Sequence, residues 1–202
     1  MGYDNELVAQ KLRRWESYLN QFRLPAWEEL PDIGLYMEQL IELLKQYLDY
    51  LPPELKDSEV ITAAAINNYV RTKIMPGPRK RRYYREHIAY LIILLTLKQS
   101  LPIAMIGRIM PMEQSAEDVE RIYRAFSKQH TAMAQFFIEQ IAQTAAPILR
   151  GEHTDAPAAE CAEELIMQSA ILGGFTCLLA EKLILLADKP NPPEEELAPY
   201  GE

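Results

Sequence analysis

The chain has 202 residues, of which 49% are hydrophobic and 25% charged, and its formal net charge at pH 7 is −8. This length provides one large domain or two small ones with a substantial core, and the composition excludes a disordered chain. Few glycines and many Leu, Ala, Ile, Glu and Gln residues favour a mostly helical protein. Two cysteines exclude a disulfide scaffold, and residues 1–15 lack the apolar run of a signal peptide, so we expect a cytoplasmic protein.

The charge is distributed unevenly along the chain. Residues 57–110 hold nine Lys or Arg and three acidic residues, a net charge of +6, so the remainder carries −14. The chain as a whole is therefore too acidic to be a nucleic-acid coat protein. A basic block inside an acidic chain instead predicts one surface for a polyanion and a separate role for the rest.

Apolar residues at spacings of three and four predict helices along most of the chain. The expected ranges are 4–22, 35–51, 63–73, 85–99, 101–110, 116–143 and 158–187. The expected N-cap residues are Asp32, Thr62, Ser100 and Ser115, the last in a capping box with Asp118. Pro52-Pro53 should end the second helix, and residues 147–157 should form a linker. The length of the 116–143 helix predicts a kink or a break.

Residues 74–84 read IMPGPRKRRYY. Two prolines, one glycine and four consecutive basic residues are incompatible with the interior of a helix. The segment predicts a turn or a short hairpin with the basic residues at its tip or in its second strand.

The helix over 62–73 and the wing over 78–84 carry side chains suited to nucleic acid. Asn67 and Asn68 can bond base edges or phosphates, and the basic side chains would release counterions from DNA. The candidate DNA-binding residues are Thr62, Asn67, Asn68, Tyr69, Arg71, Lys73, Arg79, Lys80, Arg81, Arg82 and Tyr83.

This stretch resembles the DNA-binding domain of MerR-type transcription regulators. The matching segments are 65–70 at the recognition helix, 73–75 at the turn, 78–79 at the wing, 82–84 at the strand and 99–106 at the last helical segment. The resemblance implies an all-α fold with a short β-wing, a winged helix-turn-helix. In such a fold helix 62–73 enters the major groove of double-stranded DNA, and wing 78–84 contacts the flanking backbone.

The sequence departs from the MerR pattern at several positions. Asn67 stands where the family has an arginine, Tyr69 alone remains of an aromatic pair, and Lys73 replaces the glycine of the turn. Residues 52–61 also separate the helix over 35–51 from the recognition helix. The target sequence and the promoter-twisting mechanism of that family therefore do not carry over.

More narrowly, the combination of INNYV, RRYY and LKQ resembles an uncharacterised bacterial family that is catalogued as a domain of unknown function. This resemblance covers residues 5–115. Together with the basic block, the two resemblances predict a DNA-binding transcriptional regulator with an N-terminal helical region over 1–112, whose winged core is 57–112. A helical region over 113–187 would serve dimerisation, and the Pro- and Glu-rich tail over 188–202 would be disordered.

Residues 165–180 contain no formal charge. A membrane span needs about 20 apolar residues, and Gln168, Ser169, Gly173 and Gly174 dilute this run further. We therefore expect no membrane segment, and interpret these residues as a buried helix of the core or of a dimer interface. Because a monomer of this size offers few places to bury such a helix, a homodimer is favoured.

No Gly-rich phosphate loop, HExxH motif or nucleophile elbow occurs in the sequence. His153, Cys161 and Cys177 match no standard zinc spacing, and both cysteines fit small buried positions. We expect neither catalysis nor a cofactor nor a metal. Two alternatives to DNA binding stay open. The basic face could meet an acidic protein or an acidic part of its own chain, or the C-terminal helices could bind an unknown small-molecule effector or substrate.

Overall fold

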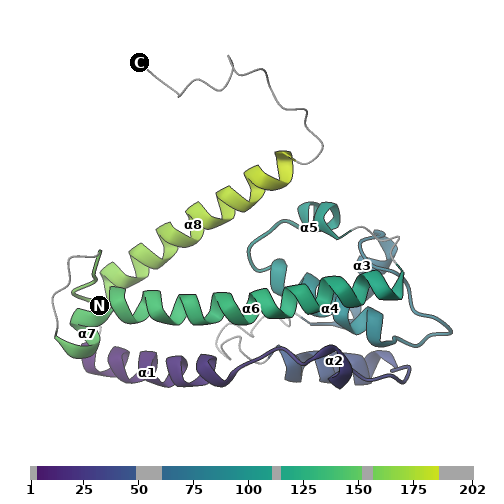
Figure 1. Cartoon of the computed structure of the whole chain (residues 1–202), viewed down its shortest axis with the longest axis horizontal. Helices are drawn as coiled ribbons and strands as arrows, with labels where there is room; N and C mark the ends of the chain where they lie inside the picture. The colour runs from purple at the N-terminus through teal and green to yellow at the C-terminus, as the bar shows by residue number, and fades with distance from the viewer. Residues whose placement is uncertain (1–3, 49–60, 111–114, 152–156, 187–202) are drawn as a thin grey trace, which may run out of the picture.

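The computed structural model describes residues 4–48, 61–110, 115–151 and 157–186 (Figure 1). The described residues are mostly helical, and strand pairing within them is limited to two isolated bridges. The elements are α1 (Asn5–Gln21), the 3-10 turn η1 (Trp27–Glu29), α2 (Met37–Tyr47), α3 (Ala63–Arg71), α4 (Arg85–Leu97), α5 (Ile103–Ile109), α6 (Ala116–Thr144), α7 (Ala146–Arg150) and α8 (Ala162–Leu186). The all-α prediction is confirmed.

The core is built around α4. Its residues 87–95 are all buried, which requires neighbours on every side of the helix. α6 and α2 pack directly against it, and α3 packs on α2. Figure 1 shows α6 running the length of the molecule, with α1 beside one end and α4 beside the other. Because Val119 and Tyr123 of α6 belong to the same apolar cluster as α4, the core is continuous across residue 112.

Two of the predicted helix caps are confirmed. The Thr62 hydroxyl oxygen accepts a hydrogen bond from the Ala65 N–H (3.1 Å), and Ser115 accepts one from the Asp118 N–H (3.1 Å). Such bonds satisfy amide donors that the first turn of a helix leaves without partners.

Two other predicted caps are wrong. Asp32 does not begin α2, because the chain bends at residues 32 and 33 and the helix starts only after Tyr36, whose N–H donates to Gln39 (3.0 Å). The residue before α5 is Pro102 rather than Ser100. The expected end of the second helix at Pro52-Pro53 is also wrong, because α2 ends at Tyr47 with Leu48 as its C-cap, before the proline pair.

α6 is one uninterrupted helix of 29 residues, so the predicted alternative of a break is wrong. Contacts with α4, η1, α1 and α7 support it along its length. The predicted linker over 147–157 is also partly wrong, since α7 occupies its first residues and ends at Gly151, which has a φ of 67°. A left-handed residue after a helix ends it and favours glycine.

α8 leaves the body of the molecule at an angle to α6 and approaches it again near α5 (Figure 1). Ile184 is buried against the core, whereas most large apolar residues of α8 are exposed. The expectation of a helix buried in the core is therefore wrong, and the dimer interface stays a prediction. In the described part of the chain α8 is the one helix long and apolar enough to cross a membrane.

Cys161 and Cys177 are half-buried rather than buried. The tail over 188–202 lies outside the described residues.

Candidate nucleic-acid interface

α3 has one buried and one exposed face. Ile66 and Tyr69 point into the core, where both are almost fully buried. Asn67, Asn68 and Arg71 are exposed and share the opposite side of the helix because they are three and four residues apart. The Arg71 guanidinium donates to the side-chain oxygen of Asn68 (2.6 Å), which holds the cation along this face.

α3 ends in a turn that places Lys73 in the left-handed region, with a φ of 55°. The Ile74 N–H donates to the Tyr69 carbonyl (2.9 Å), and the Lys73 N–H donates to that of Val70 (3.1 Å). This pair of bonds is a Schellman motif, whose left-handed position strongly favours glycine. The structure therefore places an exposed lysine where the backbone suits a glycine.

The basic segment folds into a two-residue hairpin. Arg79 and Arg82 exchange two backbone hydrogen bonds of 3.0 Å each, and the residues between them, Lys80 and Arg81, have φ angles of 50° and 63°. Positive φ at both central residues is typical of a type I′ turn, for which Asn-Gly is the preferred sequence. The prediction of a turn or short hairpin over 74–84 is confirmed.

Within the described ranges, the non-glycine residues with positive φ are Lys73, Lys80 and Arg81. All three are exposed cations of the basic block. A non-glycine residue in this region costs about 1–2 kcal/mol, and such strain gathers at functional sites. The backbone conformation at these three positions thus favours glycine or asparagine, whereas the sequence places a cation at each of them.

The two arginines that flank the hairpin tip are held against the protein. Arg79 forms an ion pair with Glu86 and lies over the ring of Tyr84, with its guanidinium carbon 4.6 Å from the ring centroid. Arg82 donates to the Tyr36 hydroxyl (3.0 Å) and lies over the Tyr36 ring. Neither Lys80 nor Arg81 forms an ion pair with any described residue, so the tip presents both charges to solvent.

The base of the hairpin is tied to the segment before α2. Leu35 and Tyr83 exchange two backbone hydrogen bonds of 2.8 and 2.9 Å. The chains approach so closely that a Cβ atom on Gly34 would lie 2.9 Å from the Cβ of Arg82. A residue larger than glycine therefore does not fit at position 34 without moving the hairpin.

The buried side chain of His87 forms hydrogen bonds with backbone groups on both sides of the hairpin. His87 Nδ1 accepts a hydrogen bond from the Tyr84 N–H (3.1 Å), and its Nε2 lies 2.9 Å from the Gly77 carbonyl oxygen. These contacts fit the neutral ring with its proton on Nε2. Burial lowers the pKa of His87, opposed by the Gly77 carbonyl and by Glu86, whose carboxylate is 3.7 Å away.

We expect His87 to make the fold less stable in mild acid. Because its pKa is lower in the folded chain than the ordinary 6.5, the unfolded chain binds a proton first, and stability falls as the pH drops below about 6.5. Urea unfolding at a series of pH values measures this loss. His87→Asn keeps a side-chain oxygen that can accept from the Tyr84 N–H. This variant should reduce the slope of the free energy of unfolding against pH. Burial also lowers the pKa of His130, so the comparison is made in a His130→Gln background. An unchanged slope in His87→Asn would contradict the assignment.

The predicted DNA-binding residues separate into two groups. Tyr69 and Tyr83 are buried, and Thr62 is half-buried as a helix cap, so these three belong to the scaffold. The Tyr69 hydroxyl accepts a hydrogen bond from Lys98 Nζ (3.1 Å). The exposed group contains Asn67, Asn68, Arg71, Lys73, Arg79, Lys80, Arg81 and Arg82.

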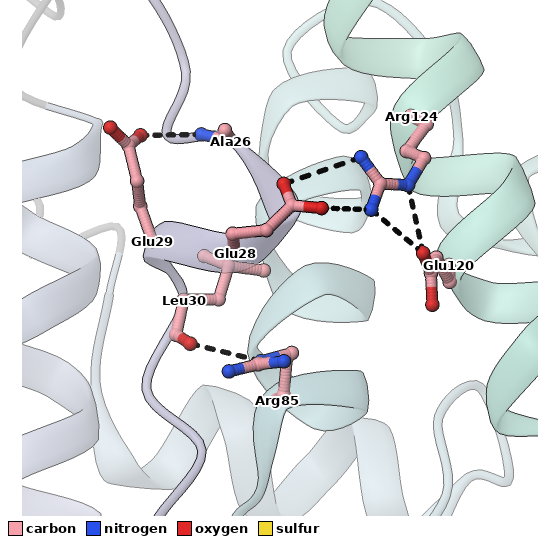
Figure 2. Close-up of polar contacts among 7 residues, drawn as sticks. All are labelled: Ala26, Glu28, Glu29, Leu30, Arg85, Glu120 and Arg124. Atoms are coloured by element: carbon pink, nitrogen blue, oxygen red, sulfur yellow. Dashed lines mark hydrogen bonds and ion pairs between the residues drawn. The ribbon is translucent and has the colours of Figure 1, made fainter.

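A second polar cluster, which the sequence did not predict, fixes the segment before α2 to the helices (Figure 2). Arg124 of α6 pairs with Glu28 of η1 and with Glu120 (2.8 Å), and the pairing with Arg124 lowers the pKa of Glu28. Arg85 Nε donates to the Leu30 carbonyl (2.9 Å), so this member of the basic block serves the scaffold. Glu28 and Arg124 are far apart in sequence, and no local pattern pairs them.

A family model described as Domain of unknown function (DUF1836) matches residues 25–126, half of the chain. The chain belongs to this family. The DUF1836 match includes α3, the hairpin and the Glu28–Arg124 pair, whereas α1 and α8 lie outside it. The expectation of an uncharacterised family is thereby confirmed. No curated protein and no solved structure matches the chain.

Proposed function

We propose that this DUF1836 protein binds double-stranded DNA through a surface made of the exposed face of α3 and the hairpin tip. The observation that carries the proposal is the strained backbone at Lys73, Lys80 and Arg81. Three cations occupy positions that suit glycine or asparagine, in a chain whose net charge is −8. Charge at these positions is best explained by a polyanion that they contact.

The α3 face supplies chemistry for reading bases. Asn67 and Asn68 expose two amides, and an asparagine can bond both the N6 and N7 atoms of adenine. A helix of nine residues is about 14 Å long, which fits a major groove about 12 Å wide. In this proposal α2 and α3 form the helix-turn-helix pair, and α3 enters the groove.

The hairpin supplies contacts to the DNA backbone. In the proposed complex it acts as the wing of a MerR-like winged helix, and Lys80 and Arg81 meet phosphates beside the major groove. Arg79 and Arg82 keep the hairpin in place through Glu86, Tyr84 and Tyr36. The role as a transcriptional regulator rests on this DNA contact, and a small-molecule effector stays a prediction.

Fluorescence anisotropy with a random-sequence duplex tests the proposal. Lys80→Ala with Arg81→Ala should weaken binding about tenfold near 0.1 M salt and reduce the salt slope by about 2, since two phosphate contacts are lost. The control is Lys11→Ala with Arg14→Ala, which removes the same charge from α1, at the far end of the molecule from α3 (Figure 1).

The control variant should bind within about twofold of the natural protein, because exposed charges beyond a Debye length are screened. Equal losses in the two double variants would mean that only net charge matters, which contradicts the assigned surface. Binding of an acidic protein with no affinity for DNA at low salt would replace the proposal with the protein-interaction alternative.

A further inference from the structure

α8 exposes an unusual amount of apolar surface. Nine of its large apolar residues have between 45% and 67% of their surface exposed: Ile166, Met167, Ile171, Leu172, Phe175, Leu178, Leu179, Leu183 and Leu185. Together they expose on the order of 900 Å², whereas the largest apolar patch of a typical monomer is about 300–600 Å². Each partner of a standard protein interface buries about 800 Å². The area is therefore sufficient for a stable dimer.

The distribution of charge along α8 argues against a lipid environment for this surface. α8 as a whole is long enough to span a bilayer, but its charge-free run between Glu164 and Glu181 has only 16 residues, about 24 Å, whereas the hydrocarbon core is about 30 Å thick. Glu163 and Glu164 precede the run, and Glu181 and Lys182 follow it one turn before the helix ends. One carboxylate oxygen of Glu164 already accepts from the Glu160 N–H (2.8 Å), but its charge has no cationic partner on α8 one turn away, and a protein partner with a complementary cation satisfies that charge better than lipid does.

A heptad pattern runs along the helix. Successive intervals of four and three residues connect Glu164, Gln168, Ile171, Phe175, Leu178 and Lys182. An average spacing of 3.5 residues is that of the seam of a coiled coil. The three central side chains are exposed by 59%, 67% and 54%. Gln168 is half-buried, and its Nε2 donates to the Ala158 carbonyl of its own chain (3.1 Å), so the apolar contact is centred on the middle three residues.

We propose that α8 pairs with α8 of a second copy in an antiparallel coiled coil centred on Gly173. Residue 173 is the midpoint of three pairs on the seam: 164 with 182, 168 with 178, and 171 with 175. One antiparallel arrangement therefore sets Ile171 against Phe175 of the second copy. The same arrangement sets Glu164 against Lys182 of the second copy, once at each end.

A parallel arrangement does not satisfy the charges. It would bring Glu164 beside Glu164 of the second copy, and Lys182 beside Lys182, and like charges within a coiled coil repel. Charge complementarity thus selects both the partner, a second copy, and its direction. α8 lies outside the residues of the DUF1836 match, so this interface stands or fails independently of DNA binding.

A charge-exchange cycle on the full chain tests the interface. Analytical ultracentrifugation from about 0.1 to 100 μM measures the dimer dissociation constant. Glu164→Lys and Lys182→Glu should each raise it at least about tenfold, because each change sets like charges together at both ends. The double variant restores opposite charges and should return within about threefold of the natural protein. Thermal melting followed by circular dichroism checks that every variant is folded.

Three results would overturn the proposal. If the single and double variants all dimerise like the natural protein, the helices are not antiparallel in this register. A folded natural protein that stays monomeric at the highest concentration has no such interface. Flotation of the natural protein with vesicles of phosphatidylcholine and phosphatidylglycerol would identify lipid as the occupant of the α8 surface.

Discussion

Lys80→Asn together with Arg81→Gly is expected to stabilise the fold and to weaken DNA binding. Asn-Gly is the preferred sequence of a type I′ turn, and the natural residues hold φ angles of 50° and 63° at a steric cost. Relief of that strain should raise the free energy of unfolding by about 1–2 kcal/mol. The loss of two exposed cations should reduce affinity for duplex DNA about tenfold near 0.1 M salt. Urea unfolding and anisotropy measure the two effects.

The double alanine variant at the same positions separates the effect of backbone strain on stability from the effect of charge on DNA affinity. Lys80→Ala with Arg81→Ala removes the same two cations but leaves a side chain at each left-handed position, so it should lose affinity without gaining stability. An Asn-Gly variant that binds DNA as tightly as the natural protein would mean that the strained cations serve no contact. This result would remove the main support for the proposed function.

Gly34→Ala is expected to destabilise the fold by about 1–3 kcal/mol, the usual range for an added methyl group in a packed site. Its Cβ would lie 2.9 Å from the Cβ of Arg82, a position that the backbone pairing of Tyr83 with Leu35 fixes. Because the added atom pushes the hairpin away from α2, DNA affinity should fall as well. Thermal unfolding and anisotropy on the same samples report both losses.

Gly107→Ala is the matched control for this substitution. Gly107 lies in α5, and a Cβ there would meet no atom within 4 Å. Alanine in an open helical position should therefore stabilise the protein by about 0.5–1 kcal/mol. If Gly34→Ala and Gly107→Ala shift the melting temperature in the same direction, the close approach at Gly34 does not constrain the hairpin.

Local patterns predicted the helices better than the segments between them. The cap at Thr62 and the capping box at Ser115 follow from side chains that bond within four residues, and both were visible in the sequence. The start of α2 was not visible in the sequence, because the pairing of Leu35 with Tyr83 holds the residues before Tyr36. Such a contact between distant segments leaves no periodicity within one window.

The candidate site was predictable in its charge but not in its conformation. The run Arg79–Arg82 marked the hairpin, and the exposed face of α3 contains both asparagines that the sequence singled out. The positive φ angles at Lys73, Lys80 and Arg81 were not foreseen, since glycine is the usual signal for them. The hydrogen bonds of the buried His87 ring were also not predicted, because its partners are backbone groups, which any residue carries.

The partner of α8 could not be predicted from its hydrophobicity alone. Its uncharged run predicted a covered helix, and the structure of one chain leaves that surface exposed. A hydrophobic sequence indicates that cover is needed, but the position of Glu164 and Lys182 on the same seam is what identifies the partner.

Backbone amide NMR of the labelled full chain, titrated with a random-sequence duplex at low salt, tests the DNA-binding surface most directly. Resonance shifts should concentrate at Asn67, Asn68, Arg71, Lys80 and Arg81 and disappear as salt is raised. The amides of α1 and α8 should stay in place. Shifts confined to α1 or α8, or no shifts at low salt, would contradict the assignment of α3 and the hairpin as a nucleic-acid interface.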